Sequence, residues 1–408
     1  MSVRIGVDEL EGVVEKLRAA GAWTEGSKAV QAVDLQRLDA RIEELQRSFP
    51  ADALHAVAIK AMPLVAVLRR IVSRGAGLEA ASWEEVALAR AAGCPGDRIV
   101  FDGPAKTDEE LRAALDLGCW LNADHPRELE RLAALGAPGD ARVGVRVNPE
   151  IGAGSIGFTS TVAKGSKFGV PLRDAPSLRD RFPFLTGLHV HTGSQGCGLD
   201  LLTAAAWRTA EIVEQLDLDW LDVGGGLPVR YTDRDPEPPT VAAWAEALAG
   251  MPGWGSRRLL TEVGRHVHAG GGITISRIEA VKEVDGEPLL VVHVGADLLL
   301  RRVYRPDDWD HEFIVTDPTG RPRQGEARST KIGGPLCFSG DLLARGRALP
   351  EAREGDLLII RDTGAYTLSM WSRHCSRGLP PVWGLDGGDV ERLFAGESPQ
   401  DVVRFWGG

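Results

Sequence analysis

Short apolar segments alternate with helical patterns through the first part of the chain. The segments with the character of buried strands are residues 56–59, 77–81, 98–101, 119–122, 142–147, 185–191, 220–223 and 259–262. Between most of them, apolar residues recur at helical spacing over residues 67–73, 84–92, 108–117, 127–135 and 202–215. About eight strands that alternate with helices predict an α/β fold, a closed parallel (β/α)8 barrel. A doubly wound open sheet is the second possibility, but no GxGxxG motif opens the first helix.

The pattern changes after Arg265, where helical periodicity almost disappears. Residues 273–284, 289–294, 312–317, 329–332, 356–361 and 402–405 have the character of strands, with turn residues between them. They predict a mostly antiparallel β domain from about residue 271 onward. Ahead of the barrel, residues 1–30 predict an amphipathic helix followed by a glycine-rich passage. Residues 34–49 predict a second helix.

The composition is that of a soluble globular protein, because 43% of the 408 residues are hydrophobic and 26% are charged. A net charge of −11 argues against nucleic acid as a partner, since phosphate binding needs a basic face. The N-terminus lacks the layout of a signal peptide, and no apolar run is long enough to span a bilayer. The five cysteines are scattered, which suits a reducing compartment and predicts no disulfide or metal site. We therefore expect a cytoplasmic protein with no nucleic-acid or membrane partner.

The candidate chemistry lies at the carboxyl ends of the predicted strands, which line the active site in barrels of this kind. Lys60 follows the first strand, and a lysine at the exit of a buried strand is costly unless it has a partner or a task. A lysine whose charged end reaches water is the ordinary alternative. The other strand-end residues are Glu79, Arg146, Asn148, His191, Ser194, Gly224, Gly225, Gly226, Glu262 and Arg265.

Several of these residues together predict a phosphate site. The backbone N–H groups of Gly224, Gly225 and Gly226 can form an anion-binding nest, although a tight turn is the ordinary alternative for glycines. Ser194 can add a hydroxyl group, and Arg265 can add a charge-assisted hydrogen bond. A phosphate site combined with a strand-end lysine suggests pyridoxal 5'-phosphate, held by that lysine as a Schiff base.

Two further residues acquire roles around such a cofactor. Glu262 would lie against the pyridine nitrogen and keep it protonated, so that the ring accepts electrons from the substrate Cα. His191 would pack flat on the ring, and a core histidine with satisfied hydrogen bonds is its alternative role outside this context.

Several separate blocks of the sequence resemble the fold-type III pyridoxal-phosphate-dependent decarboxylases, the family that contains diaminopimelate, ornithine and arginine decarboxylases. The resemblance covers about residues 50–385. The blocks are Ala-Ile-Lys-Ala-Met-Pro at 58–63, Gly-Ala-Gly-Leu-Glu-Ala-Ala-Ser at 75–82, Ser-Lys-Phe-Gly at 166–169, Gly-Leu-His-Val-His-Thr-Gly-Ser-Gln at 187–195, Asp-Val-Gly-Gly-Gly-Leu at 222–227, Glu-Val-Gly-Arg at 262–265, Gly-Pro-Leu-Cys-Phe-Ser-Gly-Asp at 334–341 and Gly-Ala-Tyr at 364–366. Chance agreement in this order and spacing is very improbable.

The resemblance implies an architecture and an activity. It implies an alanine-racemase-like (β/α)8 barrel over residues 30–270, which binds pyridoxal 5'-phosphate. It also implies a β domain, made of residues 1–29 and 271–408, that contributes to the active site and to the interface of a head-to-tail homodimer. The activity that it implies is the α-decarboxylation of a small amino acid, the reaction of a carboxy-lyase.

The family's functional residues are carried over by matching position. The implied catalytic residues are Lys60, His191 and Cys337, and Cys337 would come from the neighbouring subunit to protonate Cα after carbon dioxide leaves. Outside this setting, Cys337 would be a small buried hydrophobe. The implied cofactor-binding residues are Lys60, Glu79, Arg146, His191, Ser194, Gly224, Gly225, Gly226, Glu262, Gly264, Arg265 and Tyr366.

The sequence departs from the family at the residue after Cys337. Diaminopimelate and ornithine decarboxylases carry a glutamate or aspartate there, which binds the distal amine of the substrate, whereas this chain has Phe338. A substrate ammonium that faces Phe338 loses a charge-assisted partner, and cation–π attraction returns only about 0.5–2 kcal/mol. We therefore predict a substrate whose distal end is apolar, aromatic or acylated, such as a siderophore-type intermediate. Simple packing is the alternative role for Phe338.

Other departures carry less information. Glu79 stands where relatives commonly have aspartate, and Val263 stands where the family usually has proline. The family's arginine–tyrosine pair, which grips the second carboxylate of the substrate, corresponds to Tyr304 with either Arg301 or Arg302, and neither arginine has the family spacing. Further candidates for specificity are Trp371, Arg373 and His374.

Two other functions remain open from the sequence. An amino-acid racemase or epimerase has the same barrel, but such enzymes typically place an arginine at the pyridine nitrogen, where this chain has Glu262. A catalytically silent, decarboxylase-like regulator would lack the lysine or the cysteine, whereas Lys60 and Cys337 are both present.

Overall fold

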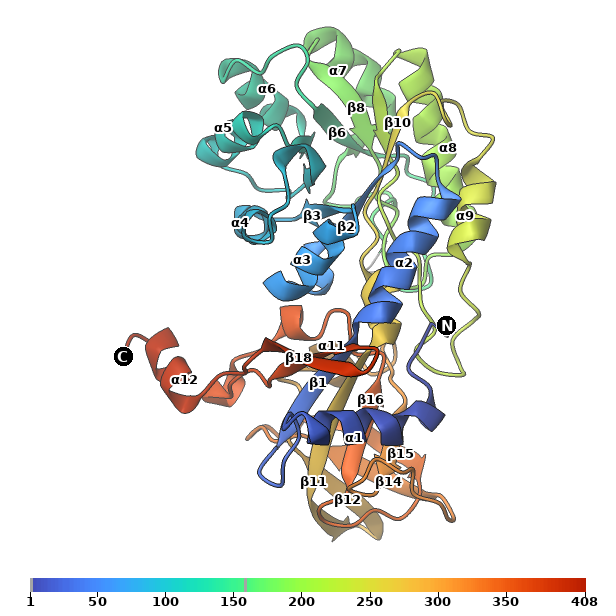
Figure 1. Cartoon of the computed structure of the whole chain (residues 1–408). Coiled ribbons are helices and arrows are strands. Elements are labelled where there is room, and N and C mark those ends of the chain that lie inside the picture. The colour runs from blue at the N-terminus through green and yellow to red at the C-terminus, as the bar shows by residue number, and fades with distance from the viewer. Residues whose placement is uncertain (1–2, 158–159) are drawn as a thin grey trace. The chain divides into compact units, whose positions relative to one another are not determined.

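A computed structural model describes residues 3–157 and 160–408 of the chain, which divide into two compact units (Figure 1). The barrel unit consists of Asp39–Val229 and Glu237–Val267. The β unit consists of the chain up to Leu38, together with Arg230–Pro236 and His268–Gly408. The domain boundaries expected from the sequence stay a prediction.

The barrel unit is a closed parallel sheet. Its strands in the described residues are β2 (Leu54–Ala58), β3 (Gly77–Ala80), β4 (Ile99–Phe101), β5 (Trp120–Ala123), β6 (Val143–Asn148), β8 (Leu185–His189), β9 (Trp220–Asp222) and β10 (Arg258–Thr261). Each strand pairs in parallel with the next in this order, and β10 pairs with β2 to close the sheet. The short strand β7 (Val170–Pro171) adds beside β6. This closure confirms the predicted (β/α)8 barrel and excludes the open sheet.

Helices cover the outside of the barrel (Figure 1). They are α3 (Val65–Ser73), α4 (Trp83–Ala91), α5 (Asp108–Leu117), α6 (Pro126–Ala134), α7 (Ala175–Arg181), α8 (Leu199–Gln215) and α9 (Val241–Leu248). Helix α5 shows why such segments are helical, because Thr107 and Glu110 form a reciprocal capping box at its start. Gly118 ends it in the left-handed conformation, with φ of 69°. Helices α2 (Leu35–Ser48) and α10 (Arg265–His268) each contain one of the points where the chain passes between units, and the segment Arg230–Pro236 provides the others.

Side chains fill the barrel interior. Trp120 on β5 and Trp220 on β9 meet edge to face, with ring centroids 5.3 Å apart and planes at 83°. Glycine at positions 144 and 187 makes room for this packing, because a Cβ on either residue would collide with the Trp220 ring. The interior is therefore a packed core, and the space for chemistry lies at the ends of the strands.

Lys106 forms a fully buried ion pair in the barrel unit. Its Nζ donates to Glu128 Oε1 at 2.6 Å and to the carbonyl oxygen of Asn122 at 2.8 Å. Glu128 Oε2 accepts from the backbone N–H of Asp124 at 3.0 Å. Both side chains are almost completely removed from water, so each charge depends on the other.

We expect the substitution Lys106→Met to lower the free energy of unfolding by about 3–5 kcal/mol, because it leaves the Glu128 carboxylate buried without its counter-charge. Urea unfolding of the barrel, followed by tryptophan fluorescence, measures this change. The double variant Lys106→Met/Glu128→Leu is expected to recover most of the loss. A cost below about 1 kcal/mol for the single variant would mean that the pair contributes little.

The β unit contains a mostly antiparallel sheet. Its strands in the described residues are β1 (Ala29–Asp34), β11 (Gly272–Val284), β12 (Glu287–Val292), β13 (Phe313–Thr316), β14 (Arg328–Gly333), β15 (Leu342–Leu349), β16 (Leu357–Arg361), β17 (Val382–Asp386) and β18 (Asp389–Phe394). The strand order is β15–β14–β12–β11–β1–β17–β18, and β16 pairs with both β11 and β13. The pairs β1–β17 and β12–β14 are parallel. The helices of this unit are α1 (Leu10–Ala19), α11 (Leu300–Tyr304) and α12 (Pro399–Phe405).

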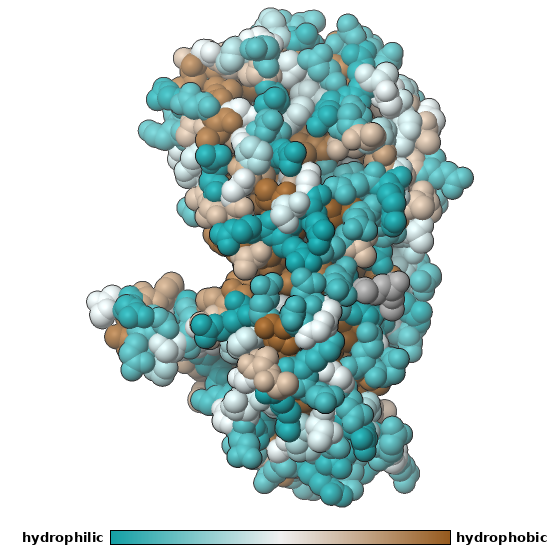
Figure 2. Space-filling model, in the orientation of Figure 1, coloured by the Kyte–Doolittle hydropathy of each residue, from teal (hydrophilic) through white to brown (hydrophobic). Residues whose placement is uncertain are grey.

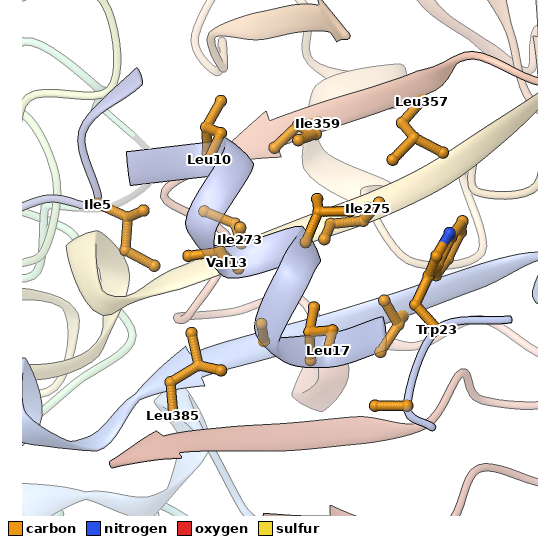
Figure 3. Packing of buried hydrophobic residues seen from close by; sticks show 14 of the residues in the cluster. Ile5, Leu10, Val13, Leu17, Trp23, Ile273, Ile275, Leu357, Ile359 and Leu385 are labelled. Carbon is orange, nitrogen blue, oxygen red and sulfur yellow. The ribbon is translucent and has the colours of Figure 1, made fainter. Parts of the chain in front are cut away.

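Helix α1 covers one face of this sheet (Figure 3). Leu10, Val13 and Leu17 recur at helical spacing and point toward apolar side chains of β11 and β16 (Figure 3). Ile275 and Ile359 are among these partners and are fully buried. The N-terminal helix predicted from the sequence is therefore part of the core of the β unit.

One predicted strand is wrong. Residues 402–405 lie in the helix α12, not in a strand. Ser398 and Asp401 form a capping box at the start of this helix, and Pro399 occupies its first turn. The apolar run at 402–405 is too short to distinguish strand from helix by its pattern, and the capping residues decide the outcome.

The face of the protein shown in Figure 2 is mostly hydrophilic, with hydrophobic residues in small groups. The large hydrophobic side chains that are most exposed include Val403, Phe405 and Trp406 of α12. Among the described residues, none of the helices combines the length and the apolar character that crossing a bilayer needs.

Candidate active site

Lys60 has a buried acidic partner. It lies just past β2, in the 3-10 turn Ile59–Ala61, and its Nζ forms an ion pair with Glu79 on the neighbouring strand β3. The two strands are in register at Ala58 and Glu79. The Lys60 side chain is 35% exposed, whereas that of Glu79 is fully buried. The lysine is therefore held at the strand end and does not simply extend into solvent.

Glu79 also contacts a second carboxyl group, that of Asp102. Asp102 follows β4 directly and is buried. Burial and the charge of Asp102 raise the pKa of Glu79 well above its ordinary value. Burial would also raise the pKa of Asp102, but the Lys60 charge and the hydrogen bond from Glu79 outweigh it and lower that pKa. Two buried carboxyl groups so close together resist ionising at the same time, and the two pKa shifts favour the proton on Glu79.

Glu262 follows β10 and is held by two imidazole rings. Its Oε2 lies 2.9 Å from Nδ1 of His191 and 3.2 Å from Nε2 of His189. Burial alone would raise the pKa of Glu262, but the two histidines outweigh it and hold that pKa well below its ordinary value. Burial lowers the pKa of His191, although its hydrogen bond with Glu262 acts in the opposite direction. Glu262 thus keeps a negative charge in a buried place.

The three consecutive glycines after β9 lie in a loop beside these residues, called the glycine turn from here on. Gly224 and Gly226 have φ of 65° and 115°, values that favour glycine. A Cβ on Gly225 would collide with the carbonyl oxygen of Glu262. Arg265 Nη2 donates to Ser194 Oγ at 2.9 Å. A cationic group and a hydroxyl group are thus joined in the same unit as the glycine turn.

The other predicted barrel residues are also placed. Arg146 lies near the end of β6, with its guanidinium carbon 4.3 Å from the centroid of the Phe168 ring. Gly264 lies between β10 and Arg265 and is buried. The roles of these two residues toward a cofactor stay a prediction.

The predicted residues Cys337 and Phe338 belong to the β unit, in a loop between β14 and β15. Cys337 is exposed. The buried carboxylate of Asp341 anchors this loop by accepting backbone N–H groups of Ala296 at 2.6 Å and of Leu336 at 2.8 Å. A Cβ at Gly340 would collide with the Phe338 ring, so glycine there allows the ring its position.

Phe338 is part of a cluster of aromatic rings in the β unit. It stacks on Tyr304 of α11, with ring centroids 5.8 Å apart and planes at 14°. It also meets His374 edge-on at 6.4 Å. Tyr304 is more than half exposed, so the cluster has an open side.

The two candidate arginines of α11 differ in their surroundings. Arg302 is occupied by Asp310, whose Oδ1 lies 3.2 Å from its Nε, and by the carbonyl oxygen of Pro306 at 3.3 Å. The guanidinium of Arg301 lies over the Tyr366 ring, 4.7 Å from the centroid. It also lies over the Trp309 ring, 4.6 Å from the centroid, and the choice between Arg301 and Arg302 for a substrate carboxylate stays open. Tyr366 has φ of 57° and belongs to the β unit, and its contact with a phosphate stays a prediction.

Three residues of the site were not singled out from the sequence. Asp102 and Asp222 end or follow predicted strands, so the same rule that selected Glu79 would have found them. His189 lies inside the strand and has no such signal, and only its contact with Glu262 shows its place.

The barrel residues fit pyridoxal 5'-phosphate by their chemistry. Arg265, Ser194 and the glycine turn suit a phosphate group, Lys60 suits a carbonyl group, and Glu262 suits a protonated ring nitrogen. Glu262 Oε1 is buried and has no donor among the described residues, so it can accept one from a ligand or from a neighbouring acid. These features define a protein that binds this cofactor at the carboxyl ends of a parallel barrel.

The chain belongs to the pyridoxal-dependent decarboxylase family. Residues 35–269 match the family model described as the pyridoxal binding domain of pyridoxal-dependent decarboxylases. A diaminopimelate decarboxylase of Zymomonas mobilis is 33% identical over 86% of this chain and 85% of its own length. One from Pseudomonas fluorescens is 35% identical over 88% of this chain and 91% of its own length.

Solved structures agree with this membership. A diaminopimelate decarboxylase of Helicobacter pylori, complexed with L-lysine, is 25% identical and superposes with a TM-score of 0.85 over 95% of this chain and 98% of its own. This chain is accordingly a carboxy-lyase that uses pyridoxal 5'-phosphate. Family membership confirms the resemblance and favours a decarboxylase over a racemase.

Proposed function

We propose that this chain removes the α-carboxylate of an amino acid whose distal end is apolar, aromatic or acylated rather than a free ammonium. The observation that carries the proposal is the ring cluster of Tyr304, Phe338 and His374 next to Cys337. The family resemblance implies an acidic residue after the cysteine, where this chain has Phe338. The relatives are diaminopimelate decarboxylases, so free diaminopimelate is the second candidate substrate.

The proposed mechanism assigns a task to each group of the chain. Pyridoxal 5'-phosphate, when bound, supplies an aromatic ring that accepts the electron pair left at Cα when carbon dioxide departs. Arg265, Ser194 and the glycine turn would bind its phosphate. Glu262 would hold a proton at the pyridine nitrogen, which its own negative charge favours.

Lys60 and Cys337 would act at the reacting carbon atoms. Lys60 is the amine that would hold the cofactor before substrate binds, and Glu79 keeps it in position at the strand end. Cys337 would donate the final proton to Cα. In the family arrangement this cysteine comes from a second subunit, so we also propose a head-to-tail homodimer, which sedimentation of the purified protein tests.

The substrate proposal is tested by measuring carbon dioxide release from a panel of amino acids. The panel contains free diaminopimelate, lysine and ornithine, their N-acylated forms at the distal amine, and aromatic amino acids. We expect the acylated or aromatic members to have the highest kcat/KM. Faster turnover of free diaminopimelate would refute the proposed distal group and establish the second candidate.

The variant Phe338→Glu is expected to raise kcat/KM for free diaminopimelate about 10–100-fold, because a hydrogen bond between charged groups contributes about 1.5–3 kcal/mol. Steady-state carbon dioxide release measures the change. Phe338→Gln is the matched control, since it has a similar shape without the charge. Equal effects of the two variants would show that Phe338 serves only packing.

A further inference from the structure

A second buried carboxyl group lies beside Glu262. Asp222 is the last residue of β9, in register with His189 of β8 and Leu260 of β10. Asp222 is fully buried and Glu262 is 1% exposed. The proposed function gives Asp222 no task.

The hydrogen bonds among the described residues leave one oxygen atom of each carboxyl group without a donor. Asp222 Oδ1 accepts the backbone N–H of Gly224 at 2.8 Å. Glu262 Oε2 is occupied by the two histidines. Asp222 Oδ2 and Glu262 Oε1 are both buried and have no donor among the described residues. The two strand ends are joined directly, because the backbone N–H of Glu262 donates to the carbonyl oxygen of Gly224 at 2.7 Å.

Two buried acceptors at neighbouring strand ends, each without a donor in the described parts of the chain, are satisfied together if one of them carries a proton. Two ionised carboxylates would repel each other strongly in a buried place, so one of the two must be protonated. Glu262 has two imidazole partners that favour its charged form, whereas one backbone N–H is the only donor to the Asp222 carboxyl group among the described residues. Burial, followed by the charge of Glu262, raises the pKa of Asp222 well above its ordinary value.

Other charged groups near the pair favour the same arrangement. Asp102, after β4, adds a further negative charge that opposes ionisation of Asp222. Lys60 offsets the charge of Asp102, with which it interacts. The titratable and charged groups that face this pair or its nearest neighbours are Lys60, Glu79, Asp102, Arg146, His189 and His191.

We propose that Asp222 is a positioning residue that keeps its proton at neutral pH and donates it as a hydrogen bond to Oε1 of Glu262. This bond fixes the orientation of the Glu262 carboxylate while adding no second negative charge. The same aspartate holds the start of the glycine turn through the N–H of Gly224, so one side chain would set both the carboxylate and the turn. The expected effect of Asp222 on catalysis rests on the proposed function, whereas the protonation of Asp222 does not.

Two substitutions separate this role from a merely structural one. In Asp222→Asn, the amide oxygen can accept from Gly224 and the amide nitrogen can donate to Glu262, as the protonated acid does. In Asp222→Leu, both bonds are lost in a side chain of similar size. We expect Asp222→Leu to weaken cofactor binding and to lower kcat, each about 10–100-fold, and Asp222→Asn to restore the larger part of both.

The proton is tested on the apoprotein, without substrate or cofactor. Infrared spectroscopy is expected to show a buried protonated carboxyl band that Asp222→Asn removes. Glu79→Gln is the matched control, because it removes the other buried carboxyl group whose pKa is raised and leaves Asp222 in place. The absence of any band specific to Asp222 at neutral pH would overturn the proposal.

The pH dependence of stability gives an independent test. The folded protein holds the Asp222 proton, and the unfolded chain releases it above the ordinary pKa of aspartate. The stabilisation from this proton is therefore fully present below the unfolded pKa and is lost as pH rises toward the raised folded pKa. From about pH 5 to about pH 8, the thermal midpoint of Asp222→Asn should rise relative to that of the wild type.

The outcomes distinguish this inference from the proposed function. If Asp222→Asn loses as much cofactor affinity as Asp222→Leu, the donated hydrogen bond is refuted. If both variants match the wild type in cofactor affinity and kcat, the positioning role is refuted. If the infrared band is assigned to Asp222 but the wild type decarboxylates no member of the panel, the proposed function is refuted. The protonation of Asp222 is supported in that case.

Discussion

Replacing Glu262 with glutamine is expected to lower kcat about 10²–10³-fold, while the protein still folds and binds pyridoxal 5'-phosphate. Glutamine keeps the shape of the side chain but not its charge. The wild-type carboxylate is ionised because His189 and His191 outweigh the effect of burial on its pKa. In the proposed mechanism that negative charge holds the proton on the pyridine nitrogen, and a neutral amide does not.

The measurement combines steady-state kinetics with an absorbance titration of the cofactor. The titration shows whether the variant still binds pyridoxal 5'-phosphate, so that a fall in kcat is not a fall in occupancy. Glu130→Gln is the matched control, because Glu130 pairs with Arg127 and Arg181 at the surface of the barrel unit. A loss of less than about threefold in Glu262→Gln would contradict the assigned role.

The second large effect is expected from Cys337→Ala, which should lower kcat about 10²–10⁴-fold, the usual contribution of a positioned acid. Cys337 is exposed on a loop whose position is fixed by Asp341. The Asp341 carboxylate accepts the backbone N–H groups of Ala296 and Leu336. The loop keeps its anchor when the thiol is removed, so we expect a loss of proton donation without a loss of folding. Incorporation of solvent deuterium at Cα of the product, followed with kcat, measures the step.

Cys375→Ala provides the control for this experiment. Cys375 is the other exposed cysteine among the described residues, and it belongs to the same unit. Its substitution should leave kcat unchanged. Equal losses in both variants would point to a general effect of thiol removal, and an unaltered kcat in Cys337→Ala would exclude this thiol as the acid.

The barrel was predictable because its strands are buried on both faces and therefore have continuous apolar sequences. Predicted and observed ends differ by one or two residues for strands such as β4 (Ile99–Phe101) and β9 (Trp220–Asp222). The strand-end rule then placed Lys60, Glu79 and Glu262 in one region, because carboxyl ends of parallel strands meet at one edge. Their pairwise contacts, such as that of Glu79 with Asp102, depend on register and could not be derived from spacing.

The elements that the sequence did not reveal are short or partly exposed. Helix α7 (Ala175–Arg181) has only two buried residues, so its apolar pattern is weak. Strand β1 (Ala29–Asp34) contains the fully buried Gln31, which interrupts the apolar run. Its amide nitrogen donates to the carbonyl oxygen of Thr363, and that contact is invisible before the fold is known.

The partners of β1 have a consequence for synthesis on the ribosome. This strand pairs with β11 at Ala29 and Ser276 and with β17 at Gln31 and Val382, so its neighbours emerge hundreds of residues later. The barrel segments between them can complete their own pairings first, because domains generally fold as units during translation. Helix α1 and strand β1 therefore have no sheet partners until β11 and β17 have been synthesised. A message truncated before residue 382 would leave β1 without one of its two neighbouring strands.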